Sequence, residues 1–309
     1  ITAEGNFEHG SSNPALVDAD IGVRDKLAAA RAKLLAHREA NRVRPGKDTK
    51  INTAWNCMLI RSMADAGFYF KRPDWLQRAR KAADFIWDEL TEQQDGALRL
   101  KAVYYQGSGA QVDGFLHDYA LAAEAFLAIA SKIDVLESGA SARYQARAQA
   151  CVDSALRYFE DPHAIGCFFT AEDTETPVAR RKEWFDNATP SGNAALLHAL
   201  SGLYALTGEG RYDSALHATL PAFADYAQKV AAGVAHALEA VTTHAIGIAV
   251  IKVRAGVSLE GLQVALAAAP WRRVFIQTTT DEQSADYQVC IGTQCLPPTD
   301  ELSEVVEVL

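Results

Sequence analysis

The 309-residue sequence has no apolar run long enough for a membrane-spanning helix. Such a helix needs about 20 consecutive apolar residues, and the longest apolar stretch near the C-terminus, residues 245–251, has the length of a strand. A basic surplus is also missing, because 39 acidic side chains outnumber 30 basic ones and the net charge is −9. Proteins that bind phosphate backbones usually carry a basic surplus. We therefore expect neither a membrane nor nucleic acid as a partner.

Cysteine is sparse, with five residues at positions 57, 151, 167, 290 and 295. An odd, scattered set is not the disulfide framework of a small secreted protein. The N-terminus has no basic segment followed by an apolar one, so no signal peptide is predicted, and we expect a cytoplasmic location. Because the sequence does not begin with Met, we expect a processed or partial product. Cys290 and Cys295 form either a disulfide or two free thiols, since no nearby His completes a zinc set.

Several catalytic motifs are absent from the sequence, namely HExxH, GxSxG, the P-loop and GxGxxG. Their absence argues against a metalloprotease, a serine hydrolase, a kinase and a Rossmann enzyme. We interpret most histidines as ordinary surface or core residues: His9, His37, His163, His198, His217, His236 and His244. The sequence therefore predicts no metal site and no cofactor.

A repeating helical pattern occupies most of the chain. Hydrophobic residues make up 49% and charged residues 22%, as in globular proteins. Apolar residues at three- and four-residue spacing predict helices, and short strand-like segments at 97–105 and 167–170 follow two of the helix pairs. The predicted helices span residues 21–42, 52–69, 73–90, 113–133, 141–159, 191–206, 211–230 and 234–241. This is the pattern of an array of αα-hairpins.

The periodicity changes after residue 245. Strands are predicted at 246–253, 271–277 and 287–290, with helices at 259–268 and 300–308, the last capped by Thr299 or Asp300. A segment of this size would be only marginally stable by itself, so we expect it to pack on the helices. The predicted fold is mainly α, with a helical-hairpin domain at 1–245 and a small α/β appendage at 246–309.

The first candidate site lies where a helix begins near residue 52. Free amide groups and the helix dipole favour polar or anionic ligands at such a position. A tryptophan beside an asparagine can stack on a sugar ring and hydrogen-bond its hydroxyls. The alternative is a capped helix with a core tryptophan and solvated charges. The candidate binding residues are Asp48, Lys50, Trp55 and Asn56.

A second candidate site is the segment His117-Asp118-Tyr119, in the first turns of a predicted helix capped by Asp113. Asp118 can serve as an acid or base if burial raises its pKa, and Tyr119 is a candidate binding residue. The alternative is that the helix dipole alone favours an aspartate in this turn.

A third candidate site is the polar loop at residues 180–193, which leads into a predicted helix. Loops that open helices often carry function, and polar groups of both signs crowd here beside two aromatic residues. A purely structural loop is the alternative. The candidates are Glu183 and Asp186 as catalytic carboxylates, Lys182, Ser191 and Asn193 as binding residues, and Arg181 beside them.

Five segments in one order carry a resemblance to a known family. They are Lys47–Lys50 with Ala54–Asn56, Gly114–Tyr119, Gly166–Thr170, Ala188–Asn193 and Cys290–Cys295. Their order resembles the C-terminal part of the thioredoxin-domain-containing, spermatogenesis-associated protein family. The resemblance implies part of an (α/α)6 toroid similar to N-acylglucosamine 2-epimerases and six-hairpin glycosidases. It also implies that the family's N-terminal thioredoxin-like domain and first hairpins are missing from this sequence.

The resulting hypothesis is a carbohydrate-related protein of the isomerase, epimerase or glycosidase type. In this hypothesis Trp55 stacks on a sugar, Asn56, Lys182 and Asn193 bind hydroxyls, and Asp118, Glu183 or Asp186 transfers protons. Two alternatives remain open. One is a scaffold that binds a protein, such as a thioredoxin-like half on a separate chain. The other is an inactive remnant of a split family member.

Overall fold

The computed structural model describes residues 5, 10, 21–175, 178–268, 273–279, 285–292 and 294–309. The chain forms two compact units, residues 1–48 and residues 49–309. The first unit contains helix α1 (Ile21–Asn41), as predicted, with exposed side chains from residue 22 onward. The predicted domain boundary at 245/246 stays a prediction, and both sides of it belong to the second unit. His9 and residues 271–272 lie outside the described residues.

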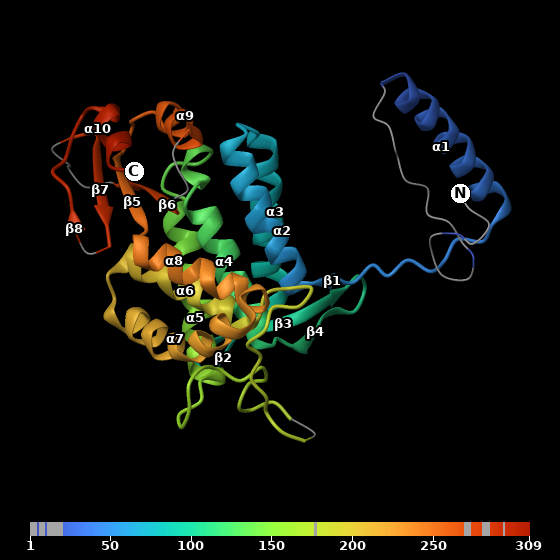
Figure 1. The fold of residues 1–309 in the computed structure, drawn as a ribbon, viewed down its shortest axis with the longest axis horizontal. Coiled ribbons are helices and arrows are strands. Elements are labelled where there is room, and N and C mark those ends of the chain that lie inside the picture. Colours follow the sequence, from blue (N-terminus) through green and yellow to red (C-terminus); the bar gives the residue numbers. More distant parts are fainter. Residues whose placement is uncertain are drawn as a thin grey trace. The chain divides into compact units, whose positions relative to one another are not determined.

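An array of helical hairpins forms most of the second unit (Figure 1), which confirms the predicted, mainly α fold class. Helix α4 packs against α2 and α6, and α6 packs against α8, so that every second helix is a neighbour in space. Helices α3, α5 and α7 each pack against the helix that precedes them. The helices are α2 (Thr53–Tyr69), α3 (Pro73–Leu90), α4 (Leu116–Ala130), α5 (Ser141–Phe159), α6 (Gly192–Thr207), α7 (Gly210–Val230) and α8 (Ala235–Ile246).

Helices α4 and α6 form the interior of the array. Every residue of α4 except His117 is buried, and in α6 the buried run extends from Gly192 to Leu203. A helix that is apolar all round is a buried helix, whereas α3 and α5 bury one face. A charged side chain on α4 or α6 therefore lies inside the protein.

The helix starts agree with the predictions to within a residue except at α4 and α10. The Asn52 side chain caps α2 by accepting from the Trp55 amide at 2.9 Å, and the Ser191 hydroxyl caps α6. The predicted cap at Asp113 is wrong, because Asp113 ends a strand and α4 begins at Leu116. The C-terminal helix α10 (Leu302–Glu307) begins after Glu301 rather than after the predicted caps.

A small antiparallel sheet lies at one end of the first hairpin. Strand β3 (Ala97–Tyr105) confirms the predicted strand and pairs with β1 (Ile51–Asn52), β2 (Thr91–Gln94) and β4 (Gly109–Asp113). The strand predicted at 167–170 is reduced to a single bridge between Glu160 and Cys167. Apart from β1, which precedes α2, this sheet is formed by the segment between α3 and α4.

The C-terminal segment forms a second sheet in the order β6-β5-β7-β8. Strands β5 (Ala249–Arg254) and β6 (Val274–Thr279) run parallel, whereas β7 (Tyr287–Ile291) pairs antiparallel with β5 and with β8 (Gln294–Cys295). A disulfide joins Cys290 to Cys295, which decides between the two states left open by the sequence. Helix α9 (Glu260–Ala268) lies between β5 and β6 in the chain.

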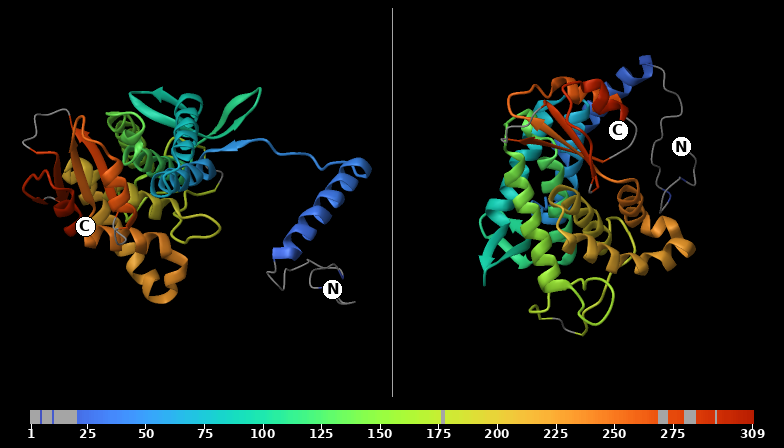
Figure 2. Two further views of the ribbon diagram at one scale, coloured as in Figure 1. Left: turned by 90° about the horizontal axis from the view of Figure 1, so that it is seen from above. Right: turned by 90° about the vertical axis from the view of Figure 1, so that its left-hand side faces the viewer.

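The second sheet packs on the helical array, as Figure 2 shows. Ile248, Val250 and Phe275 belong to the same hydrophobic core as the helices. The Thr278 amide also donates to the Asp134 carboxylate at 3.1 Å. No described helix has the length and apolar character needed to cross a membrane.

Candidate functional site

The Asp118 carboxylate lies fully buried between the starts of α2 and α4. One oxygen accepts from the Ala54 amide at 3.1 Å and the other from the Phe115 amide at 2.9 Å. Burial raises the pKa of Asp118 to about 7, against the opposing effect of these two hydrogen bonds. The neighbouring Tyr119 is also buried, and its hydroxyl accepts from the Leu100 amide. These are the contacts of structural residues, and a catalytic role for Asp118 stays a prediction.

The polar loop at residues 180–193 binds chiefly to main-chain groups. Asp186 accepts from the Ser191 and His236 amides, each at 2.9 Å. The buried Asn193 side chain exchanges two hydrogen bonds with the main chain of Cys167 and donates to the Glu183 carbonyl at 3.0 Å. Asp186 and Asn193 therefore hold the loop against α6 and α8.

The charged side chains of the same loop also have partners within the protein. The Lys182 ammonium pairs with Asp161 at 2.7 Å and donates to the Ile165 carbonyl. The Glu183 carboxylate pairs with Arg181 at 2.8 Å. A ligand would have to displace these contacts to use either group.

The first candidate site, at the start of α2, contains one side chain that is open to solvent and aromatic. Trp55 is 61% exposed, so the alternative of a core tryptophan is wrong. The Asn56 amide donates to the Asn52 carbonyl at 2.8 Å. Asp48 and Lys50 are both exposed, and Asp48 belongs to the first compact unit while Lys50 belongs to the second. Trp55 remains a surface on which a ring could stack.

A group of ionisable side chains that the sequence analysis missed lies inside the helical array. Glu124 of α4, His198 of α6 and His236 of α8 meet there, with Arg61 of α2 and Glu239 of α8 beside them. We call these five residues the buried cluster. Helices α2, α4, α6 and α8, which are successive neighbours in space, each supply at least one of its members.

Three atoms of the buried cluster point at one another without hydrogen-bond partners among the described residues. They are Glu124 Oε1, His198 Nδ1 and His236 Nε2. The Glu124 oxygen lies 3.3 Å from the His236 nitrogen and 3.8 Å from the His198 nitrogen. Buried polar atoms nearly always have a partner. Glu124 Oε1 and His236 Nε2 form an ion pair, so Nδ1 of His198 is the atom of the three that is left without a close polar partner among the described residues.

The two histidines of the buried cluster have opposite pKa shifts. Burial lowers the pKa of His198 to about 3. Burial alone would also lower the pKa of His236, but the carboxylates of Glu124 and Glu239 raise it to about 9. Burial opposes ionisation of Glu124, yet Arg61 and the histidines hold its pKa well below the usual range. Near neutral pH, His198 is neutral, while His236 and Glu124 are charged.

Arginines make the buried cluster a poor cation site. Glu124, His198 and His236 could in principle hold a metal, because their ligand atoms lie within 4.8 Å of one another. However, the Arg61 guanidinium lies 3.2 Å from the Glu124 carboxylate, and Arg273 donates to the His198 carbonyl at 3.1 Å. Nearby positive charge opposes a metal ion. Groups held in opposite protonation states suit proton transfer better.

A second group of possible metal ligands lies on the surface between α7 and α8. Asp213, His217 and His244 place their ligand atoms within 4.8 Å of one another. A cavity of about 270 Å³ lies beside Asp213 and His244. Both histidines were predicted to be ordinary surface or core residues, and the fold brings His244 beside Asp213.

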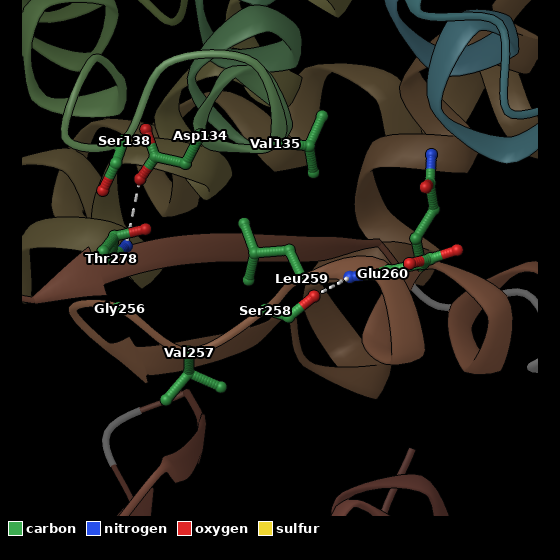
Figure 3. Close-up of a pocket in the computed structure, with 10 residues that line it drawn as sticks. Asp134, Val135, Ser138, Gly256, Val257, Ser258, Leu259, Glu260 and Thr278 are labelled. Atoms are coloured by element: carbon green, nitrogen blue, oxygen red, sulfur yellow. Dashed lines mark hydrogen bonds between the residues drawn. The ribbon is translucent and has the colours of Figure 1, made fainter.

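The larger cavity, of about 310 Å³, lies between the turn at residues 134–138 and the residues around α9 (Figure 3). Asp134 and Glu260 are its ionisable lining residues. The Asp134 carboxylate already accepts from the Ser141 amide, the Ser141 hydroxyl and the Thr278 amide. This cavity therefore lacks a cluster of free ionisable groups among its described lining residues.

A signal for the buried cluster is present in the sequence. Glu124 lies within the otherwise apolar segment Ala120–Ala130, and His198 lies among leucines and alanines. A charged residue inside a helix that is apolar on all faces must be buried. A buried acid is retained only with partners, so Glu124 could have been identified before its neighbours were known.

No protein-family model matches the chain. In a search of solved structures, the chain is 16% identical to a family 76 glycoside hydrolase from a bovine Bacteroides thetaiotaomicron strain, with a TM-score of 0.44 over 58% of this chain and 36% of that one. It is also 16% identical to cellobiose 2-epimerase from Spirochaeta thermophila, with a TM-score of 0.46 over 66% of this chain and 55% of that one.

Two curated proteins are more similar in sequence. The chain is 28% identical over 216 residues to spermatogenesis-associated protein 20 of Rattus norvegicus and 26% identical to that of Homo sapiens. Each match covers 67% of this chain and 26% of the relative, so the chain spans about a quarter of the length of these relatives. The predicted resemblance to the spermatogenesis-associated proteins is therefore confirmed.

Proposed function

We propose that the chain is a carbohydrate-active enzyme of the isomerase or epimerase type, in which His198 and His236 move a proton at a carbon beside a sugar carbonyl. The observation that supports this proposal is the meeting of Glu124, His198 and His236 inside the helical array, where Nδ1 of His198 has no hydrogen-bond partner among the described residues. Pairs of groups whose pKa values are pushed apart are typical of acid–base catalysis.

The base in this proposal is Nδ1 of His198. Its other ring nitrogen, Nε2, lies 2.9 Å from the main-chain carbonyl of His236. A carbonyl oxygen only accepts hydrogen bonds, so Nε2 carries the ring proton and Nδ1 of the neutral ring carries a lone pair. Nδ1 is the unpartnered atom in the cluster. In this proposal Nδ1 is the atom that takes up the proton from the sugar.

The acid is the protonated ring of His236. In the proposed step, the C–H proton moves to Nδ1 of His198 and the bonding electrons form an enolate with the carbonyl. A proton from His236 then returns to the same carbon for epimerisation. For isomerisation it is delivered to the former carbonyl carbon, while the hydroxyl proton of the first carbon passes to the enolate oxygen and leaves a carbonyl there. Exchange with water restores both rings. Positioned acid–base groups contribute about 10²–10⁴-fold to such a reaction.

The remaining groups of the cluster suit a sugar with a free carbonyl. The Arg61 side chain is 25% exposed and lies between Glu124 and Glu239, so its guanidinium could stabilise the enolate oxygen. Glu239 is 57% exposed and could accept from hydroxyls. In this proposal Trp55 supplies stacking, while Asp186 positions His236 through the main chain.

Solvent exchange tests the proposal directly. The full chain is incubated in D₂O with a panel of aldoses, ketoses and reducing disaccharides, and NMR follows deuterium at the carbon beside the carbonyl. We expect incorporation with at least one sugar. His198→Gln and His236→Gln should each lower its rate at least 100-fold. His163→Gln, a matched change of an exposed loop histidine, should leave the rate unchanged.

Three outcomes would count against the proposal. Exchange that persists in both variants would remove the histidines from the mechanism. Release of monosaccharides from glycosides without exchange would indicate a hydrolase instead. If none of the sugars exchanged or reacted, and the chain bound a separately supplied thioredoxin-like domain, the scaffold alternative would be favoured. Circular dichroism of each variant separates loss of chemistry from loss of fold.

A further inference from the structure

The surface group between α7 and α8 has the geometry of a metal site. Asp213 and His217 stand one turn apart on α7, and His244 lies in the last turn of α8. The Asp213 Oδ1 atom lies 3.4 Å from Nδ1 of His217 and 3.6 Å from Nε2 of His244. In a tetrahedral zinc site with bonds of about 2.0–2.1 Å, neighbouring ligand atoms are about 3.3 Å apart. The observed separations are close to that spacing.

A buried hydroxyl orients one of these ligands. Ser201 of α6 is 2% exposed, and its Oγ lies 3.3 Å from Nδ1 of His244. A polar group at the second ring nitrogen is the usual support of a metal-binding histidine, because it sets the tautomer and the ring direction. The Ser201 contact therefore directs Nε2 of His244 toward Asp213. The contact between Ser201 and His244 is an observation separate from the distances among the three ligand atoms.

The local charge also favours a cation. Among the described residues, no lysine or arginine forms an ion pair with Asp213, in contrast to the arginine beside Glu124 in the buried cluster. His217 is 57% exposed, so its ring can give up its present hydrogen bond to the Asp213 carbonyl at little cost. An ion can approach from solvent on this side.

The number of ligands indicates the kind of site. Three protein ligands leave a fourth position for water or another small ligand, as in zinc sites that exchange ligands. The cavity of about 270 Å³ beside Asp213 and His244 provides room for such a ligand. Imidazole nitrogen suits zinc and its neighbours in the periodic table, whereas magnesium and calcium prefer oxygen.

We propose that Asp213, His217 and His244 bind a divalent transition-metal ion, with Zn²⁺ strongly preferred over Mg²⁺. This proposal does not depend on the proposed function, since it shares no ligand with the buried cluster. The bound ion would join α7 to α8 at the surface and present an exchangeable position to the adjoining cavity.

Metal titration of the full chain tests this proposal. Protein stripped with a chelator is titrated with Zn²⁺ in a calorimeter and with Co²⁺, whose visible absorption reports tetrahedral coordination. We expect one ion per chain at this site. His217→Ala and Asp213→Asn should each weaken its binding at least tenfold, and Ser201→Ala should weaken it about tenfold. His163→Ala, at an exposed loop histidine, should bind as the unchanged chain does.

The outcomes that would overturn the proposal are equally specific. Absence of Zn²⁺ binding, or equal affinity for Mg²⁺, would contradict the ligand chemistry. Retention of full affinity in both His217→Ala and Asp213→Asn would place the ion elsewhere. Loss of binding in His236→Gln but not in His217→Ala would assign the ion to the buried cluster. Circular dichroism confirms that each variant is folded.

Discussion

His198 and His236 differ in charge although their ring centroids are only 4.2 Å apart. His236 lies 3.3 Å from the Glu124 carboxylate and 3.6 Å from that of Glu239. His198 is more deeply buried, at 1% exposure, and its closest carboxylate oxygens lie 3.8 Å away. Desolvation dominates for His198, whereas ion pairing dominates for His236. Small differences in burial and in distance to the carboxylates thus separate a neutral histidine from a charged one near neutral pH.

This difference predicts how stability depends on pH. The pKa of folded His236 is about 9, above the ordinary value of 6.5. Its stabilising effect is therefore complete below pH 6.5 and is lost as the pH rises through 9. We expect the free energy of unfolding to fall by at most about 3 kcal/mol over this range. His198, whose pKa is lowered to about 3, acts in the separate window between pH 6.5 and pH 3.

The measurement is urea unfolding at a series of pH values between 6 and 9.5, for the unchanged chain and for His236→Gln. The variant has no group that titrates at this position, so its curve should be flatter over that range. His163→Gln should retain the slope of the unchanged chain. If the free energy of unfolding depended on pH in the same way for the unchanged chain and for His236→Gln, the His236 ion pairs would not contribute to stability.

At the scale of elements, Asp118 connects the starts of two neighbouring inner helices. Both of its oxygens accept main-chain N–H groups, one from the start of α2 and one from the start of α4. In Asp118→Asn, the amide nitrogen cannot accept, so one buried N–H loses its partner. We expect a loss of about 1–3 kcal/mol in the free energy of unfolding. Chemical denaturation at pH 7 measures it.

The matched control for this change is Asp113→Asn. Asp113 is exposed and pairs with Lys101 at 2.8 Å at the surface, so the same substitution should cost less than about 1 kcal/mol. If Asp118→Asn abolished sugar turnover while leaving the free energy of unfolding unchanged, Asp118 would be catalytic, as the sequence analysis predicted. A loss of stability with activity retained in the folded fraction supports the structural role.

At the scale of the whole molecule, the C-terminal sheet and the helices share one core around Gly202. A Cβ atom at Gly202 of α6 would lie 2.9 Å from the Leu127 side chain of α4 and 3.3 Å from Phe275 of β6. Gly202→Val should therefore overpack the junction and lower the free energy of unfolding by about 1–3 kcal/mol. Gly210→Val is the control, because nothing lies within 4 Å of its added Cβ.

Differential scanning calorimetry, which measures the unfolding transition, tests this prediction. We expect one main transition for residues 49–309, shifted to lower temperature in Gly202→Val and nearly unchanged in Gly210→Val. Two separate transitions in the unchanged chain would instead show that the sheet and the helices unfold independently. That result would support the sequence-based boundary at 245/246 as a true domain boundary.

Local sequence patterns predicted most of the elements because the forces that form them act over a few residues. The apolar residues Leu76, Ala79, Ala83, Ile86 and Leu90 recur at helical spacing and form the buried face of α3. Asn52 caps α2 through a hydrogen bond to an amide only three residues away. The same reasoning failed at Asp113, where pairing with β3 extends the strand up to the helix start.

The polar residues that the sequence analysis selected were conspicuous for a reason that only tertiary structure explains. Asn193 contacts Cys167 and Glu183, and Asp186 contacts the main chain of His236, so these side chains hold distant segments together. A sequence shows that a polar side chain is present, but it does not show whether that side chain already forms hydrogen bonds with main-chain groups elsewhere in the fold. The candidate loop therefore resembled a binding site before its partners were known.

Sequence alone thus determined where the helices and the longer strands β3, β5, β6 and β7 form, and it placed Glu124 and His198 in apolar helices that must be buried. The fold decided which groups meet. Glu124, His198 and His236 come together because α4, α6 and α8 pack as successive neighbours, and Asp213 reaches His244 because α7 lies beside α8. Such meetings depend on how helices pack and cross, over chain separations at which local periodicity carries no information.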